Sequence, residues 1–71
     1  MHYYTVYDRK TDEILASGTA RECAYALDMT MGSFYTAIAR TRNGERQRYR
    51  FLIENIDPYT RETIDTNEEI V

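Results

Sequence analysis

The stretch TARECAYALDMTMGSFYTAIAR, residues 19–40, decides the fold, because it predicts two short helices joined by a tight corner. Thr19 and Glu22 have the T-x-x-E spacing of a capping box, in which each side chain accepts a hydrogen bond from the backbone N–H of the other. A first helix is therefore expected to begin at Ala20. Its apolar stripe follows helical spacing and consists of Cys23, Ala24 and Leu27.

A second helix is predicted beyond a corner at Asp28. Aspartate is one of the few residues other than glycine that tolerate a left-handed backbone, and Thr30 can then cap the next helix. The apolar face of that helix consists of Phe34, Ala37 and Ile38, with the corner residue Met29 beside them. The other face presents Met31, Ser33, Tyr35, Thr36 and Arg40. Packed across a turn of about three to four residues, the pair would bury one shared core and leave the second helix exposed.

Strands are predicted on both sides of the helix pair. Residues 3–7 (YYTVY) and 14–17 are rich in strand-forming side chains and flank a polar turn, so they are expected to form a hairpin. Residues 46–53 (RQRYRFLI) follow an Asn-Gly turn and alternate between arginines and apolar side chains. We therefore expect an α+β domain over residues 1–53, with the order β-β-α-α-β and a three-stranded antiparallel sheet packed on the helices.

Residues 54–71 lack such a pattern and are acidic, with six carboxylates against a single arginine. Pro58 also disfavours a helix just before it. Two interpretations stay open for this acidic tail. It is either flexible, or a docking arm whose apolar residues pack on this domain or on a partner: Ile56, Tyr59, Ile64 and Ile70.

Charge is what separates a DNA-binding helix-turn-helix from an ordinary helical hairpin, since both fit residues 19–40. The net charge of −3 would by itself argue against nucleic acid. However, residues 40–53 contain five arginines and one glutamate, so a basic block lies directly behind the second helix. Local fields govern contact with phosphates more than the total charge does. The distribution therefore favours DNA binding.

Composition excludes several other classes. A chain of 71 residues allows one domain, which buries only about 60% of its unfolded surface, so a large catalytic cleft is not expected. Because the sequence has a single cysteine, Cys23, an internal disulfide is excluded, and this residue is expected to be a buried hydrophobe. The single histidine, His2, supports neither a nucleophilic pair nor a metal site. We expect no cofactor, no catalysis and no metal. No membrane span or signal peptide is visible, and a cytoplasmic setting is expected.

The order of residues resembles the small nuclease-associated modular DNA-binding domains found beside homing endonuclease catalytic domains, and related phage and mobile-element modules. The matching positions are Val6, Tyr7, Asp8, Ile14, Leu15, Gly18, Thr19, residues 22–24, Leu27, Ser33, Phe34 and residues 49–51. Cys23 stands where the family has a small alanine, and Asp28 stands at the corner glycine. Phe34 is larger than the usual aliphatic residue, and an acidic tail takes the place of a catalytic domain. The resemblance implies DNA binding through the second helix without nuclease activity.

The residues predicted to contact DNA fall into two sets. The first lies at the start and outer face of the second helix, where hydroxyls can reach bases or phosphates and glycine permits close approach: Thr30, Met31, Gly32, Ser33, Tyr35 and Thr36. The second would bind phosphates through guanidinium groups: Arg40, Arg42, Arg46, Arg48 and Arg50. For both sets a solvated surface without a ligand is the competing interpretation.

Strong sequence specificity is not expected, because the second helix presents no arginine or asparagine pair suited to guanine or adenine. Binding by a monomer should be weak, and a two-fold dimer or tethering to another protein would raise the affinity. The alternative function is a protein-interaction module in which the acidic tail occupies a partner's basic groove, as a nucleic-acid mimic or host-factor inhibitor does. The same tail could also fold back over the arginines.

Overall fold

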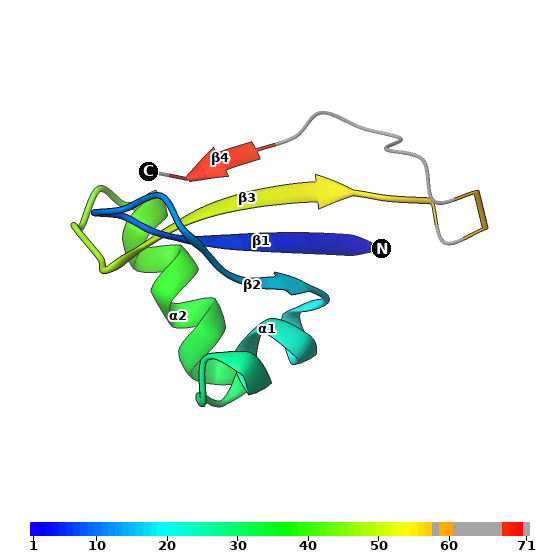
Figure 1. The fold of residues 1–71 in the computed structure, drawn as a ribbon, viewed down its shortest axis with the longest axis horizontal. Helices are drawn as coiled ribbons and strands as arrows, with labels where there is room; N and C mark the ends of the chain where they lie inside the picture. Colours follow the sequence, from blue (N-terminus) through cyan, green and yellow to red (C-terminus); the bar gives the residue numbers. More distant parts are fainter. Residues whose placement is uncertain (58, 61–67, 71) are drawn as a thin grey trace.

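The computed structural model describes residues 1–57, 59–60 and 68–70. Its helices and strands are, in chain order, β1 (His2–Asp8), β2 (Ile14–Gly18), α1 (Ala20–Ala26), α2 (Met31–Arg42), β3 (Tyr49–Asn55) and β4 (Glu68–Ile70). Within this described part, four strands form one antiparallel sheet in the order β2-β1-β3-β4. Helices α1 and α2 both lie on one face of that sheet (Figure 1). The α+β class is therefore confirmed.

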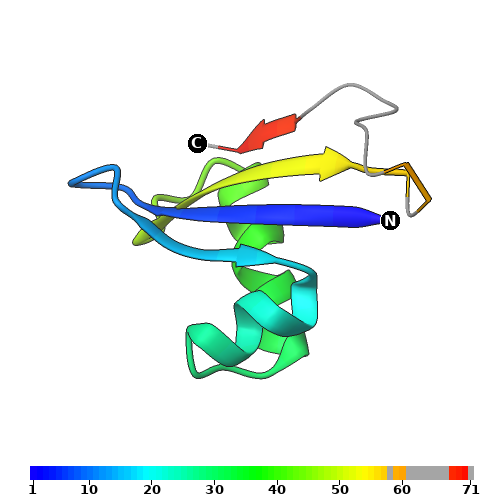
Figure 2. The same ribbon diagram turned by 45° about the vertical axis from the view of Figure 1, so that its right-hand side comes forward.

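The predicted three-stranded sheet is wrong, because the end of the acidic tail forms a fourth strand. β4 runs antiparallel to β3 with Ile70 opposite Phe51 and Glu68 opposite Ile53 (Figure 2). Ile70 is only 4% exposed and belongs to the core. Of the other apolar residues predicted in this segment, Tyr59 is 93% exposed, and Ile64 lies outside the described residues.

The sequence Glu-Glu-Ile has little strand propensity of its own, so its position in the sheet depends on its neighbours. Glu68 pairs with Arg42 and Glu69 pairs with Arg50. The third residue of the strand, Ile70, is apolar and buried in the core. Both glutamates are matched by arginines that lie far away along the chain. Local pattern could not reveal this match.

The third strand also begins later than residues 46–53 predicted, at Tyr49 rather than at Arg46. Its partner β1 ends at Asp8, which lies opposite Tyr49, and the chain then turns away into the hairpin loop. Backbone groups before Tyr49 therefore have no strand to pair with. Instead, the carbonyls of Gln47 and Arg48 accept hydrogen bonds from Arg9, through its Nε at 2.7 Å and its backbone N–H at 3.0 Å.

An aromatic cluster joins α2 to the two central strands. Phe34 is fully buried, and its ring meets Tyr4 of β1 edge-on at 5.3 Å and Phe51 of β3 at 5.9 Å between centroids. The α1 stripe adds the buried Cys23 and Ala24, as predicted. Because both helices share this core, the outer face of α2 is left to solvent.

The predicted capping box forms at the start of α1. Thr19 Oγ1 accepts from the Glu22 N–H at 3.3 Å, and Glu22 Oε1 accepts from the Thr19 N–H at 2.9 Å. The Thr19 backbone N–H lowers the pKa of Glu22, because it stabilises the carboxylate. Gly18 precedes the box with a φ of 131°, and a Cβ there would lie 2.8 Å from Glu22 Oε1. Only glycine leaves room for this cap.

Asp28 makes the corner between the helices in the left-handed conformation predicted for it, with a φ of 56°. The backbone N–H of Met29 donates to the carbonyl of Ala24 at 2.9 Å, and the backbone N–H of Asp28 donates to the carbonyl of Tyr25 at 3.1 Å. These are the two bonds of a Schellman motif, in which the left-handed position is usually glycine. The end of α2 repeats the motif with Gly44 at that position, at a φ of 93°.

Substitution Asp28→Gly is expected to raise the free energy of unfolding by about 0.5 to 1 kcal/mol. Glycine removes the left-handed penalty of an L-residue, and its greater freedom in the unfolded chain offsets part of that gain. Asp28→Ala should lower stability instead, because alanine tolerates the left-handed conformation less well than aspartate does. Urea denaturation of the two variants measures both effects. Shifts of the same sign would contradict the backbone explanation.

Candidate nucleic-acid interface

The outer face of α2 is exposed, as predicted from its periodicity. Met31 is 39% exposed and Tyr35 48% exposed, and Gly32, Ser33 and Thr36 are also exposed. The hydroxyl of Thr30, the N-cap, accepts from the Ser33 N–H and donates to Ser33 Oγ, both at 3.1 Å. The Thr30 hydroxyl therefore caps α2, and Ser33 Oγ keeps its own proton to donate outward.

A shallow groove of about 660 Å³ runs beside this face, between α2 and the segment that leads into β3. It joins five residues of the predicted DNA-contacting set to the start of the third strand. Its lining consists of Met29, Thr30, Gly32, Ser33, Thr36, Ala37, Arg40, Gln47 and Tyr49. α2 contains no acidic residue, so the helix side of the groove has no carboxylate.

The five predicted arginines do not share one surface. Arg40 lines the groove, and Arg46 and Arg48 lie in the loop before β3. All three are exposed, and no carboxylate within the described part of the chain pairs with them. Arg42 instead forms a two-pronged pair with Glu68, at 2.8 and 3.2 Å. That pair places it beside β4 at the end of α2.

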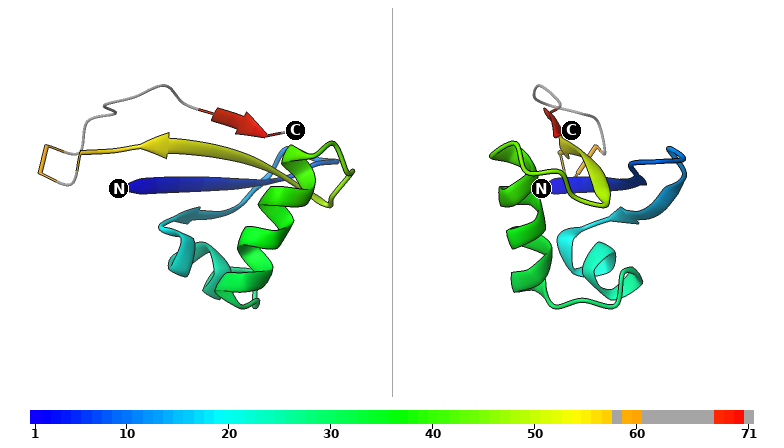
Figure 3. Two further views of the ribbon diagram at one scale, coloured as in Figure 1. Left: turned by 180° about the vertical axis from the view of Figure 1, so that it is seen from behind. Right: turned by 90° about the vertical axis from the view of Figure 1, so that its left-hand side faces the viewer.

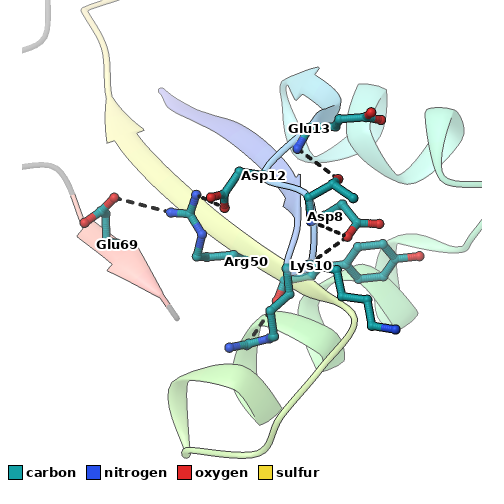
Figure 4. A network of polar contacts seen from close by, with 9 residues as sticks. Asp8, Lys10, Asp12, Glu13, Arg50 and Glu69 are labelled. Carbon is teal, nitrogen blue, oxygen red and sulfur yellow. Dashed lines mark hydrogen bonds and ion pairs between the residues drawn. The ribbon is translucent and has the colours of Figure 1, made fainter.

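Arg50 lies on the opposite face of the sheet from the helices, because its neighbour Phe51 faces the core. Its guanidinium group bridges Asp12 of the hairpin loop at 2.9 Å and Glu69 of β4 at 3.6 Å (Figure 4). The same group lies over the Tyr7 ring, 4.5 Å from its centroid. Since its side chain is 22% exposed and has two acidic partners, Arg50 has little remaining capacity for phosphate.

Two basic residues missed in the sequence lie near Arg46 and Arg48. Arg9 and Lys10 belong to the hairpin loop, and with these arginines, Asp8 and Gln47 they line a hollow of about 690 Å³. Only the pairing of β1 with β3 brings the two loops together. The register pairs Asp8 with Tyr49. Knowledge of this register would have predicted the basic cluster, because the residues that follow Asp8 and those that precede Tyr49 then lie side by side.

The thiol of Cys23 is buried and donates to the Tyr4 carbonyl at 3.6 Å. Burial, and then the negative charge of Glu22, raise its pKa to about 11. Burial also raises the pKa of Tyr4. A thiol with so high a pKa is protonated at neutral pH and is a poor nucleophile.

Within the part of the chain that the structure describes, no three or more histidine, cysteine, aspartate or glutamate side chains gather into a possible metal site. None of the described helices has both the length and the apolar character that crossing a membrane requires. Comparison of the chain with protein-family models, curated proteins and solved structures finds no match. The resemblance to nuclease-associated modules therefore stays a prediction.

Proposed function

We propose that this domain is a non-catalytic module that binds duplex DNA through the outer face of α2. The observation that best supports the proposal is the groove beside that face. It leads from the hydroxyl-bearing start of a helix without carboxylates to exposed arginines that no carboxylate of the described residues neutralises. Phosphate oxygens are the ligands that such guanidinium groups prefer.

In this arrangement the start of α2 approaches the major groove, where Gly32 permits close contact and Thr36 and Tyr35 can bond bases or phosphates. Arg40 is the phosphate contact closest to the helix. We assign no phosphate contact to Arg42 or Arg50, because each has a carboxylate partner within the domain. With few groups suited to read bases, the contacts favour weak binding of low specificity.

A matched pair of single substitutions tests this assignment. Arg40→Gln should weaken binding to a short labelled duplex and lower the slope of log affinity against log salt by about 0.9, the value expected for one lost phosphate contact. Arg50→Gln removes the same charge from the opposite face and should leave the slope unchanged. Fluorescence anisotropy over a range of salt concentrations measures both.

Two results would reject the proposal. Absence of binding by the unaltered chain at low salt would exclude DNA as the ligand. Equal effects of Arg40→Gln and Arg50→Gln would show that any binding depends on total charge rather than on the α2 face. Circular dichroism of both variants should show unchanged secondary structure, which separates loss of contact from loss of fold.

The alternative, an acidic tail that binds a partner's basic groove, has less support because Glu68 and Glu69 already pair with arginines of this chain. Truncation after residue 53 would not separate the two functions, because it would remove more than the acidic side chains. The buried Ile70 would be lost, and so would the bond from the Ile56 N–H to the Met1 carbonyl at 2.8 Å. The Arg40 and Arg50 variants leave Ile70 and this backbone bond in place.

A further inference from the structure

We propose that the hollow between the hairpin loop and the segment before β3 is a phosphate-binding pocket. We call it the basic pocket and define it by Arg9, Lys10, Arg46 and Arg48. We assign to it a backbone phosphate of the DNA strand that lies along α2. This assignment of the ligand's source rests on the proposed function, whereas the affinity for phosphate itself does not.

The charge of the basic pocket is strongly one-sided. Four cationic side chains surround a hollow of about 690 Å³, and Asp8 is the acidic residue among those that line it. One carboxylate oxygen of Asp8 is engaged by its own loop, since it accepts from the N–H groups of Lys10 at 2.8 Å and Thr11 at 3.2 Å. Like charges around one hollow repel one another, and a bound anion would relieve that repulsion.

Arg9 is held in position before any ligand binds. Its Nε donates to the Gln47 carbonyl at 2.7 Å and its Nη2 to the Tyr49 carbonyl at 3.3 Å. A guanidinium group has about five N–H donors, so this anchoring leaves others for an anion. The guanidinium carbon of Arg48 lies 6.0 Å from the centroid of the adjacent Tyr49 ring, at the outer limit of a cation–π contact. Fixed donors lower the entropy lost on binding.

The basic pocket continues from the groove beside α2. Gln47 lines both the groove and the pocket, so they adjoin at this residue. The two loops that form the pocket lie at the same end of the sheet, next to the end of α2 (Figure 3). A strand that contacts α2 and Arg40 can therefore place a neighbouring phosphate in the pocket. A tetrahedral anion with several acceptor oxygens suits a group of guanidinium donors better than a single chloride does.

Inorganic phosphate is the probe that tests the pocket without DNA. In an NMR titration at constant ionic strength, phosphate should shift the backbone amides of Arg9, Lys10 and residues 46–48 in a saturable manner, whereas chloride should not. The double variant Lys10→Gln/Arg46→Gln should weaken phosphate binding at least fivefold. Both side chains are exposed and outside the strand ladder, so the fold should persist. Arg21→Gln, on the exposed surface of α1, is the control and should leave phosphate binding unchanged.

The same double variant then tests the source of the phosphate. Because both side chains are assigned to the same phosphate, the log-log salt slope of the double variant for duplex DNA should fall by about 0.9, the value for one lost phosphate contact. Saturable phosphate binding in a chain that does not bind DNA would support the pocket and reject the proposed function. Unchanged DNA affinity in the double variant would reject the assignment to a DNA phosphate, even where α2 binds. Shifts that do not saturate, or that spread over the whole surface, would overturn the pocket itself.

Discussion

Replacement of Phe34 by alanine is expected to lower the free energy of unfolding by about 3 to 5 kcal/mol. Phe34 is fully buried, and its ring packs edge-on against Tyr4 and Phe51, so the substitution would open a cavity where α2 meets β1 and β3. Small domains have total stabilities near the lower end of about 5 to 15 kcal/mol. The variant should therefore be largely unfolded in mild denaturant, which urea denaturation followed by circular dichroism measures.

Tyr25→Ala is the matched control, because it also removes an aromatic ring from a helix but at a position that is 88% exposed. Exposed substitutions of this kind change stability by about 0.5 kcal/mol or less. A small and equal loss in both variants would show that Phe34 does not organise the core. It would also remove the physical reason for α2 to present its outer face to solvent.

The second large effect is expected at Ile70, where substitution by alanine should cost about 2 to 3 kcal/mol. Ile70 is 4% exposed and pairs with Phe51, so the fourth strand contributes to the same core as the helices. The expected loss is at the lower end for such substitutions, because β4 is a three-residue edge strand that can relax into part of the cavity. Hydrogen exchange should quicken at the β3 amides that face β4.

Ile14→Ala provides the comparison, since Ile14 is also on an edge strand but is 63% exposed. Its substitution should cost well under 1 kcal/mol, because little apolar area returns to water. If the two isoleucine variants were equally stable and the β3 amides exchanged at the unaltered rate, β4 would not be held as described. The pairing of Glu68 with Arg42 would then also be in doubt.

Elements specified by neighbouring residues were predictable. The capping box at Thr19, the left-handed corner at Asp28 and the apolar stripe through Phe34 and Ile38 each depend on residues a few positions apart. Hydrogen bonds of this kind form within one or two helical turns, so their geometry can be read from spacing. The outer face of α2 was predictable for the same reason, because the helical period separates it from the buried face.

The arrangement of charge around α2 was not predictable, because it depends on strand register. Alternation correctly placed the side chains of Arg50 and Phe51 on the two different faces of the strand. However, nothing local indicated that Asp12 and Glu69 would pair with Arg50. Nor did spacing indicate that Glu68 would reach Arg42, 26 positions away. Such pairs form only when the sheet brings distant segments together.

The chain's local patterns thus specify its helix pair, its hairpin and the exposed surface that we propose binds DNA. Tertiary structure decides how many strands the sheet has and which arginines remain available. It also decides that Arg9 and Lys10 join Arg46 and Arg48 in one pocket. The physical reason is range: capping and periodicity act over a few residues, whereas strand pairing depends on side-chain packing and charge between segments that are remote in the sequence.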